Sequence, residues 1–427
     1  MGKEIVIEES NKMPGEQSRL WKHEDIIQVL RNDLGTGKVE AISLHLQDEN
    51  EKVEISSTAF KQMHNVRFFQ ITNFVNYPEN SMLLLPNGLE FLPADLRYLS
   101  WDLYPLSYLP SNFCPENLVA LGMRHSKLKE LWNMDKCLQS LKMVDHSFSE
   151  DLIRIPDFSK ALNLEGLDLR GCSSLVEISS PPQARSSSDV QLQIPCNIEY
   201  LDLSGTRIEQ LPTNIGSVEG LQWLYVSKCM NLQQLPNSMN QLKKLSKLDC
   251  SGCEGLKLPP LNGLSNLRKI DVGNFHMSEF PNGLCSLTSL EDIILRGNNF
   301  KSIPAAINEL YMLSSLDLRD CNRLEYIPKL PPSLEALDAT DCTSLESVST
   351  VVLPKHELLL RNCIKLKQEA RSTITDDVLE SYLYDNEDKN GFCELSVAGS
   401  EVPQSIKYKN INGSSLSVTL DCHDLIG

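Results

Sequence analysis

The sequence predicts an α/β repeat fold, a solenoid in which successive coils each contribute one short strand to a continuous parallel β-sheet. Three observations predict it. A block of the form LxxLxLxx(C/N/T)xxLxx(L/I)P recurs along the 427 residues, clear neighbouring blocks start 21 to 24 residues apart, and many blocks end in proline. A fixed period of this length is typical of chains whose repeats bury an apolar face by stacking, because one repeat cannot bury it alone.

Each position of the block has a predicted direction. The fourth and sixth residues are expected to point into the coil, so the third, fifth and seventh point outward and form a concave wall. The closing proline fixes φ and lacks an amide donor, so the far side should be extended or tightly turned rather than a long helix. Period and pattern lie in the leucine-rich-repeat range, and we predict a horseshoe over residues 39–366. Blocks begin at Leu96, Leu118, Leu141, Leu164, Ile198, Leu221, Leu245, Leu267, Leu290, Leu313 and Leu334, with weaker versions at Val39, Val66 and Lys355.

The ninth position is expected to hydrogen-bond the backbone at the turn that leaves the strand. This packing role accounts for six of the thirteen cysteines, which we predict to be reduced thiols. Cys250 and Cys253 have zinc-ligand spacing, but Cys250 occupies an inward leucine position, so we expect no metal site. The ninth-position residues are Cys172, Thr206, Cys229, Cys253, Asn298, Cys321, Cys342 and Cys363.

Before the clear repeats, Ile26, Ile27 and Leu30 fall on one helical face, and Gly35 and Gly37 follow. The pattern predicts a short helix and its end. The letters GTGK resemble a phosphate-binding loop, but Asn32 stands where its first glycine belongs and Val39 where its hydroxyl belongs. We therefore expect no cofactor.

Three further segments depart from the repeat. The Ser- and Pro-rich stretch between Ile178 and Ile198 predicts a surface loop. Residues 367–391 predict an acidic helix and linker that caps the last coil, with a solvated tail as the alternative. From residue 392 to residue 427, alternating apolar and polar residues predict β-strands of a second domain.

Composition narrows the class of partner. A net charge of -17 disfavours binding to nucleic acid or to an anionic membrane surface, since both would repel the chain. No stretch is long and apolar enough for a membrane helix, and the first residues lack the apolar core of a signal peptide. We expect a soluble chain with a protein partner.

The outward positions supply the candidate binding residues. The fifth-position column is rich in aspartate, including Asp202, Asp249 and Asp271, and the next outward column contains Arg296 and Arg319. Two interpretations stay open: a solvated ladder, or an acidic wall that docks a basic patch.

Aromatic residues interrupt the aspartate column. Tyr200, Trp223 and Tyr225 are predicted to lie outward on two adjacent repeats and, with Arg296 further along, to form a protein contact site. The alternative is that the altered coil before Ile198 covers them. His146 replaces an inward leucine and is interpreted as a core histidine rather than a pH switch. No catalytic set of residues is predicted.

Several segments together carry a family resemblance. They include "PGEQSRLWKHEDIIQVL", "AFKQMHNVRFFQI", "LPADLRYLSWDLYPLSYLPSNFCPENLVALGMRHSKLKELW" and "IPDFSKALNLEGLDLRGCSSLVEI". Over almost its whole length the chain resembles a plant TIR-NB-LRR disease-resistance protein. The stretch "GSEVPQSIKYKNINGSSLSVTL" resembles the start of the jelly-roll or Ig-like domain that follows the repeats in this family, although Ser405 stands where the family usually has tryptophan.

The resemblance implies domains and a function. Residues 1–38 would be the end of the nucleotide-binding module, residues 39–366 the repeats, residues 367–391 the cap and residues 392–427 the start of the post-repeat domain. The family's NAD-cleaving TIR domain and its nucleotide-binding motifs are missing, so we expect no enzyme in this chain.

The implied role is recognition of a pathogen effector or guarded host protein in plant defence, with restraint of the nucleotide-binding module through contacts within a full receptor. The expected place is the cytoplasm, with the nucleus as a second. The alternative is a stand-alone repeat scaffold or decoy, or a non-functional truncated receptor.

Overall fold

The predicted strands form at the third to fifth positions of the blocks. The computed structural model describes residues 13–46, 52–73, 83–132, 138–176, 178, 194–349, 357–374, 393–398, 410–412 and 415–420. The chain divides into two compact units, Met1–Leu232 (unit 1) and Gln233–Gly427 (unit 2). In both units the predicted α/β repeat solenoid with a parallel sheet is confirmed.

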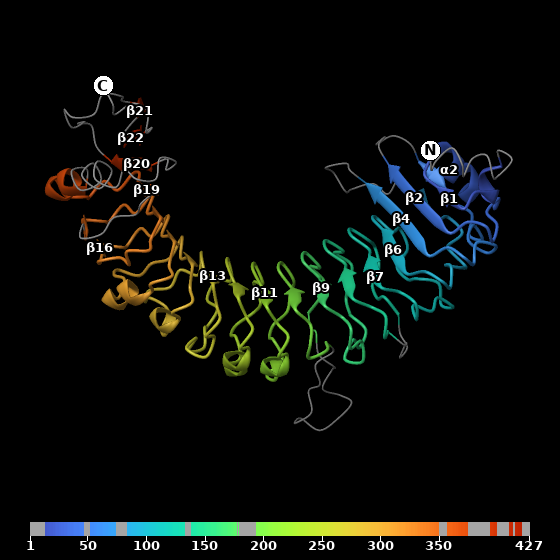
Figure 1. Ribbon diagram of the computed structural model, residues 1–427, viewed down its shortest axis with the longest axis horizontal. Helices are drawn as coiled ribbons and strands as arrows, with labels where there is room; N and C mark the ends of the chain where they lie inside the picture. Colours follow the sequence, from blue (N-terminus) through green and yellow to red (C-terminus); the bar gives the residue numbers. More distant parts are fainter. Residues whose placement is uncertain are drawn as a thin grey trace. The chain divides into compact units, whose positions relative to one another are not determined.

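Unit 1 contains a parallel sheet built one strand per coil (Figure 1). A separate parallel pair, β3 and β5, lies outside this sheet. The helix predicted from Ile26, Ile27 and Leu30 forms as α2, and all three side chains are buried. The strands and helices of unit 1 are η1 (Pro14–Glu16), β1 (Arg19–Leu20), α2 (His23–Arg31), β2 (Ala41–Leu46), β3 (Val53–Glu54), β4 (Phe68–Asn73), β5 (Leu83–Leu84), β6 (Tyr98–Trp101), β7 (Ala120–Gly122), β8 (Met143–Asp145), β9 (Gly166–Asp168), β10 (Tyr200–Asp202), η3 (Ile215–Ser217) and β11 (Trp223–Tyr225).

Unit 2 continues the same pattern and ends differently. The backbone of β20 pairs in parallel with β19, while β22 pairs antiparallel with β20 and β21 antiparallel with β22. Two of the strands predicted beyond residue 392 therefore form, and the first of them extends the sheet of the repeats. The elements of unit 2 are η4 (Asn237–Gln241), β12 (Lys247–Asp249), β13 (Lys269–Asp271), η5 (Leu284–Ser286), β14 (Asp292–Ile294), η6 (Ala305–Glu309), β15 (Ser315–Asp317), β16 (Tyr326–Ile327), β17 (Ala336–Asp338), β18 (Ser347–Val348), β19 (Glu357–Leu360), β20 (Cys393–Ala398), β21 (Asn410–Asn412) and β22 (Ser415–Leu420).

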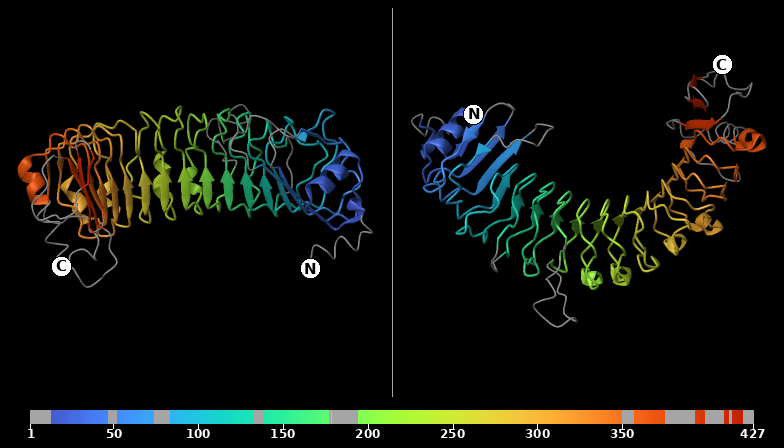
Figure 2. Two further views of the ribbon diagram at one scale, coloured as in Figure 1. Left: turned by 90° about the horizontal axis from the view of Figure 1, so that it is seen from above. Right: turned by 180° about the vertical axis from the view of Figure 1, so that it is seen from behind.

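In the part of the chain that the structure describes, the far side of the coils carries short helical turns, as the prolines predict. Pro236 and Pro304 are the N-caps of η4 and η6, in extended conformation. Each of these 3-10 helices has five residues or fewer, and they lie across the coil from the strands (Figure 2). Proline holds the chain extended until the turn begins, which limits each helix to one or two turns.

Six of the eight ninth-position side chains bond a carbonyl of the preceding coil, whereas Thr206 bonds the Leu203 carbonyl of its own coil. The buried thiol of Cys172 donates to the carbonyl of His146, and that of Cys229 to the carbonyl of Leu203. Cys321, Cys342 and Cys363 make the same bond in unit 2, at 3.1 to 3.3 Å between sulfur and oxygen. In every case the acceptor is the sixth-position carbonyl of the preceding coil. The predicted packing role is confirmed.

The eighth position adopts a left-handed backbone throughout the repeats, which the block pattern does not reveal. Phe148 has a φ of 60° and Lys228 a φ of 56°, while glycine fills the position at Gly171 and Gly205. Glycine adopts this region without strain, whereas a bulky side chain costs about 1–2 kcal/mol there. The backbone conformation of this turn is therefore imposed by the packing of the coils and not by the residue type at the eighth position.

The remaining tail and loop predictions are partly described. Residues 368–374 are helical, and Ile374 is fully buried, where the cap was predicted. Residues 375–392 and most of the predicted surface loop, residues 179–193, lie outside the described residues. The four domain boundaries predicted from the sequence stay predictions.

Candidate functional site

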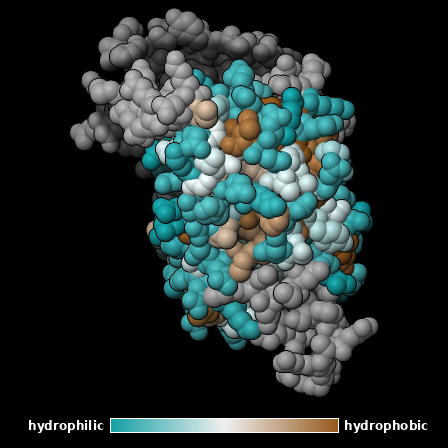
Figure 3. Space-filling view, turned by 90° about the vertical axis from the view of Figure 1, so that its right-hand side faces the viewer, coloured by the Kyte–Doolittle hydropathy of each residue, from teal (hydrophilic) through white to brown (hydrophobic). Residues whose placement is uncertain are grey.

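The outward side of the sheet, made by the third, fifth and seventh residues of each block, is called here the sheet face. In unit 1 the third-position residues stand in one column, because the register of the strands pairs each directly with the next. Seen from its N-terminal side, the described surface of unit 1 is mostly hydrophilic with small hydrophobic areas (Figure 3). The column contains Ala41, Phe68, Tyr98, Ala120, Met143, Gly166, Tyr200 and Trp223.

This column, named the apolar column, makes contact from one strand to the next. Phe68 stacks on Tyr98 with ring centroids 4.7 Å apart. Met143 lies over Gly166, where an added Cβ would stand 2.6 Å from the methionine methyl carbon. Phe68, Met143 and Trp223 remain 36%, 42% and 39% exposed. Aligning such side chains in water gains a folded chain nothing, which marks the column as a candidate contact surface.

The predicted aromatic residues come together at one end of the apolar column. The ring of Tyr200 lies 6.5 Å from that of Trp223 and 5.6 Å from that of Tyr225. Trp223 is exposed, and both tyrosines are partly buried. We call Tyr200, Trp223 and Tyr225 the aromatic patch. Whether the altered coil before Ile198 covers it stays open, since residues 179–193 lie outside the described part of the chain.

The fifth-position aspartates serve the turns of the coils. The Oδ1 of Asp202 accepts the N–H of Ser204 at 2.9 Å, and the Oδ1 of Asp271 accepts the N–H of Gly273 at the same distance. Asp249 does likewise with Ser251. An aspartate that accepts the amide two residues on stabilises a turn. The same bond recurs at Asp145, Asp168, Asp317 and Asp338.

Arginines from the seventh position neutralise most of these carboxylates. The guanidinium of Arg170 lies 3.2 Å from the carboxylate of Asp168, and that of Arg319 lies 2.6 Å from Asp317. Arg319 also approaches Asp338 at 3.5 Å, and Arg124 approaches Asp145 at 2.6 Å. The aspartate column is therefore a bonded structural ladder with paired cations, a third arrangement beside the two interpretations left open by the sequence.

Asp202 is the exception in unit 1. Its Oδ1 accepts the Ser204 amide and its Oδ2 accepts the hydroxyl of Tyr200 at 3.3 Å. Within the described ranges, no lysine, arginine or histidine nitrogen lies within ion-pair distance of its carboxylate. The residue is only 3% exposed. A carboxylate thus lies beside the aromatic patch without the cation that Asp145 and Asp168 have.

Burial and neighbouring charge shift several pKa values on the sheet face. Burial raises the pKa of Asp168, and the charges of Asp145 and Asp202 act in the same direction. Burial also raises the pKa of Asp271, although the amide of Gly273 opposes it. Burial and then the charges of Asp202 and Asp168 raise the pKa of Tyr200. All of these directions follow from placing acids side by side in a partly buried row.

The other predicted site residues lie in unit 2. Arg296 lies 3.9 Å from the carboxylate of Asp271, so these two are brought together. Asp249 and Arg319 have the bonds given above. The structure thus gathers Tyr200, Trp223, Tyr225 and Asp202 in unit 1, and it places Arg296, Asp249, Asp271 and Arg319 in the turn-stabilising ladder of unit 2.

Phe68, Tyr98 and Met143 were missed by the sequence reasoning. Each is the third residue of a block, so the alternation that identified Tyr200 and Trp223 contained the signal. The blocks at Val39 and Val66 are irregular in spacing, which hides the column at its N-terminal end. Only the strand register shows that these residues continue the aromatic patch.

His146 is a buried core residue, in agreement with its interpretation. It is fully buried, and its Nδ1 lies 3.4 Å from the hydroxyl of Ser149. Its Nε2 has no hydrogen-bond partner among the described residues. Burial lowers the pKa of His146 to about 4 despite the nearby charge of Asp145. The imidazole is therefore neutral at pH 7.

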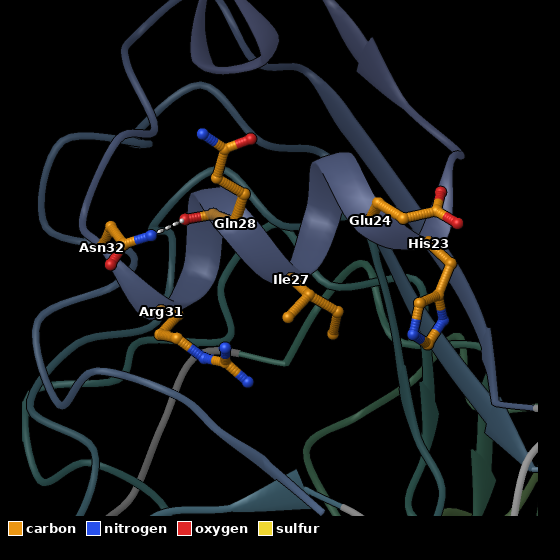
Figure 4. A pocket seen from close by; sticks show the side chains of 6 residues that line it. All are labelled: His23, Glu24, Ile27, Gln28, Arg31 and Asn32. Carbon is orange, nitrogen blue, oxygen red and sulfur yellow. Dashed lines mark hydrogen bonds between the residues drawn. The ribbon is translucent and has the colours of Figure 1, made fainter. Parts of the chain in front are cut away.

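Other possible sites carry no recognisable chemistry. A depression of ≈ 280 Å³ runs along α2 and is lined by six side chains of that helix and its end (Figure 4). Asn32 within it donates to the carbonyl of Gln28. Among the described residues, no group of His, Cys, Asp and Glu is arranged to hold a metal ion. No helix in the same ranges has the length and apolarity to cross a membrane.

Comparison with known proteins agrees with the geometry. A leucine-rich repeat region model matches residues 138–291. The chain is 32% identical to the disease resistance protein RPS4B of Arabidopsis thaliana over 99% of the chain and 38% of that protein. It is 34% identical to the Arabidopsis disease resistance protein RPP2A over 77% of the chain and 20% of that protein. A solved LRR protein of Leptospira interrogans is 18% identical with a TM-score of 0.48, covering 79% of each chain.

The fold and the match to the leucine-rich repeat model define a leucine-rich-repeat protein. The chain spans about two fifths of the length of RPS4B and less of RPP2A. The chain is similar to plant disease-resistance proteins, which confirms the resemblance to a TIR-NB-LRR protein found in the sequence.

Proposed function

We propose that this chain is the region of a plant immune receptor that recognises another protein, and that the apolar column and aromatic patch of unit 1 make the contact. The observation that carries the proposal is the exposure of Phe68, Met143 and Trp223 in one register column. Trp and Tyr residues in such positions are the side chains most often found at binding hot spots.

The partner in this proposal is a pathogen effector or a host protein guarded by the receptor, and the place is the cytoplasm. In a full-length receptor the same region would also contact the nucleotide-binding module and restrain it. Support comes from the relatives, which are disease-resistance proteins. In this proposal the chain acts by binding, and the sheet-face aspartates stabilise turns and in most cases pair with arginines.

The experiment compares two residues of the same column position in the two units. A photo-crosslinking phenylalanine analogue replaces either Tyr200 in unit 1 or Ser315 in unit 2, and the chain is expressed in plant tissue challenged with a pathogen. Covalent adducts are identified by mass spectrometry, and the partner is then purified and titrated against the chain. We expect adducts at position 200 and few at position 315.

Affinity measured with the purified partner completes the test. Trp223→Ala should weaken binding by about 2 kcal/mol, which is roughly 30-fold. The matched control Ser315→Ala should leave affinity unchanged. Equal adducts at both positions, or a Trp223→Ala variant that binds normally, would exclude unit 1 as the contact surface. A chain that binds its partner but leaves a full receptor's signalling unaltered would support the scaffold or decoy instead.

A further inference from the structure

The charge at the aromatic patch identifies the chemistry of what it binds. Resting on the proposed function, we infer that Tyr200, Trp223 and Tyr225 receive a positively charged side chain, lysine or arginine, from the bound protein segment. The inference combines the exposed ring of Trp223 with the carboxylate of Asp202 beside the patch, which has no cationic partner among the described residues.

The ring arrangement suits a cation. Tyr200 meets Trp223 at an interplanar angle of 63° and Tyr225 at 49°, so the three rings turn faces in different directions. Trp223 keeps 39% of its surface exposed. A cation within roughly 6 Å of a ring centroid is attracted by the negative face of the ring, and tryptophan attracts it most strongly.

Asp202 supplies the second, independent observation. In the coil before it, Asp168 is paired with Arg170, and in the coil before that, Asp145 is paired with Arg124. Asp202 instead accepts the hydroxyl of Tyr200, which draws the carboxylate against an aromatic ring. Because this carboxylate is almost completely buried, its charge is screened less than that of a surface acid. A ligand cation over the patch would complete the alternation of acid and base along the ladder.

Unit 1 already contains a contact of this kind, between a seventh-position and an eighth-position residue. The guanidinium of Arg170 lies 5.5 Å from the centroid of the exposed Phe148 ring. Arg170 therefore bonds Asp168 on one side and an aromatic ring on the other. The aromatic patch and Asp202 supply a ring and a carboxylate, as Phe148 and Asp168 do, and the bound segment would supply the cation.

Other occupants fit less well. A phosphorylated or otherwise anionic segment would meet the negative charge of Asp202 and Asp168, whose influence on Tyr200 is described above. An aliphatic side chain could pack on the rings but would gain nothing from Asp202. The aliphatic alternative is therefore the comparison that decides the question.

The test uses the full chain labelled with 5-fluorotryptophan, with the Trp223 signal assigned by its loss in Trp223→Phe. The probes are capped heptapeptides Ser-Gly-Leu-X-Leu-Gly-Ser in which X is lysine, arginine or norleucine. Norleucine keeps the four-carbon chain of lysine and lacks the charge. Lysine and arginine peptides should shift the Trp223 signal with an affinity roughly five- to tenfold above that of norleucine, and added salt should reduce the difference.

Two variants separate charge from packing. Asp202→Asn keeps the side-chain oxygen that accepts the Ser204 amide, and it should bring the lysine peptide down to the norleucine affinity. The matched control Asp271→Asn in unit 2 should leave the difference intact. Equal affinity for lysine and norleucine in the unaltered chain, or a difference that survives Asp202→Asn, would overturn the inference.

The failure of this inference can be told apart from failure of the proposed function. Suppose that the norleucine peptide binds as well as the lysine peptide while Trp223→Ala still lowers affinity for the natural partner. Unit 1 then remains the contact surface, and the inference that the patch receives a cationic side chain is wrong. If crosslinking places the partner elsewhere, the proposed function itself fails, whatever the peptides do.

Discussion

The third-position column of unit 1 and that of unit 2 occupy equivalent places in the repeat and carry opposite chemistry. In unit 1 the column contains Phe68, Tyr98, Met143, Tyr200 and Trp223. In unit 2 it contains charged and small residues, Lys247, Lys269, Asp292, Ser315, Ala336 and Glu357. Lys269 and Asp292 even form an ion pair at 3.0 Å. Both units bury the fourth- and sixth-position residues of their blocks, so the fold does not demand the apolar column.

If the two units differ on the sheet face and not at the fourth-position core, the same core substitution should destabilise each unit equally. Leu224→Ala in β11 and Leu316→Ala in β15 each remove a buried fourth-position leucine. Each should lower the free energy of unfolding by about 2–5 kcal/mol, measured by urea denaturation. A large difference between the two variants would mean that the units differ in their cores as well as on the sheet face.

Acid should weaken unit 1 through His146, for which unit 2 has leucine at the same block position, as in Leu318. Since burial lowers the pKa of His146 to about 4, the unfolded chain binds the proton more tightly than the folded chain. Stability contributed by the neutral imidazole is present above the ordinary histidine pKa of about 6.5 and is lost as pH falls toward 4.

The measurement compares unfolding of the unaltered chain and His146→Leu between pH 7 and pH 4. The unaltered chain should lose roughly 2–3 kcal/mol more than the variant over this range. Parallel pH dependence in the two proteins would show that the histidine is not buried in its neutral form.

Replacing an apolar third-position residue of unit 1 by a charged one should leave stability almost unchanged and weaken partner binding. Trp223→Lys gives unit 1 the kind of residue that unit 2 has at this position. It should change the free energy of unfolding by less than about 0.5 kcal/mol, since the side chain is exposed. Partner affinity should fall by about 2 kcal/mol or more. A loss of stability larger than the loss of binding would assign Trp223 a structural role.

The smallest effect concerns the aspartate ladder, which should behave alike in both units. Asp145→Ala and Asp317→Ala each remove the acceptor of a turn amide and the partner of an arginine. Each should lower stability by about 1 kcal/mol in thermal or urea unfolding. If neither variant lowers the free energy of unfolding, the aspartates form the solvated ladder that the sequence left open as an interpretation.

Much of the fold could be predicted because the block pattern fixes inward and outward positions independently of contacts. The strands at Ile198 and Leu221, for example, begin at the third residue, as alternation requires. The role of Asp202 could not be predicted in the same way. Its bond to the Ser204 amide depends on the turn that follows. The eighth residue, whose left-handed backbone shapes this turn, differs in type from block to block, so no sequence pattern predicts it.

The candidate site shows the same limit. The aromatic patch was identified from block positions alone, but its continuation through Met143 to Phe68 needs the register of six strand pairings. The sequence groups Arg296 with the patch by its outward position, and in the structure its guanidinium lies 3.9 Å from the carboxylate of Asp271. Contacts between residues on different strands depend on the strand register, which the sequence alone does not reveal.

The ninth-position bonds have a consequence for how such chains change over generations. Each coil brings its own donor, as Cys229 and Cys342 do, and uses a carbonyl that every coil possesses. Duplicating or deleting one whole coil therefore leaves every donor with an acceptor and creates no unpaired buried group. Unequal recombination between repeats can therefore lengthen or shorten the solenoid in single steps, each of which keeps the coil-to-coil bonds paired.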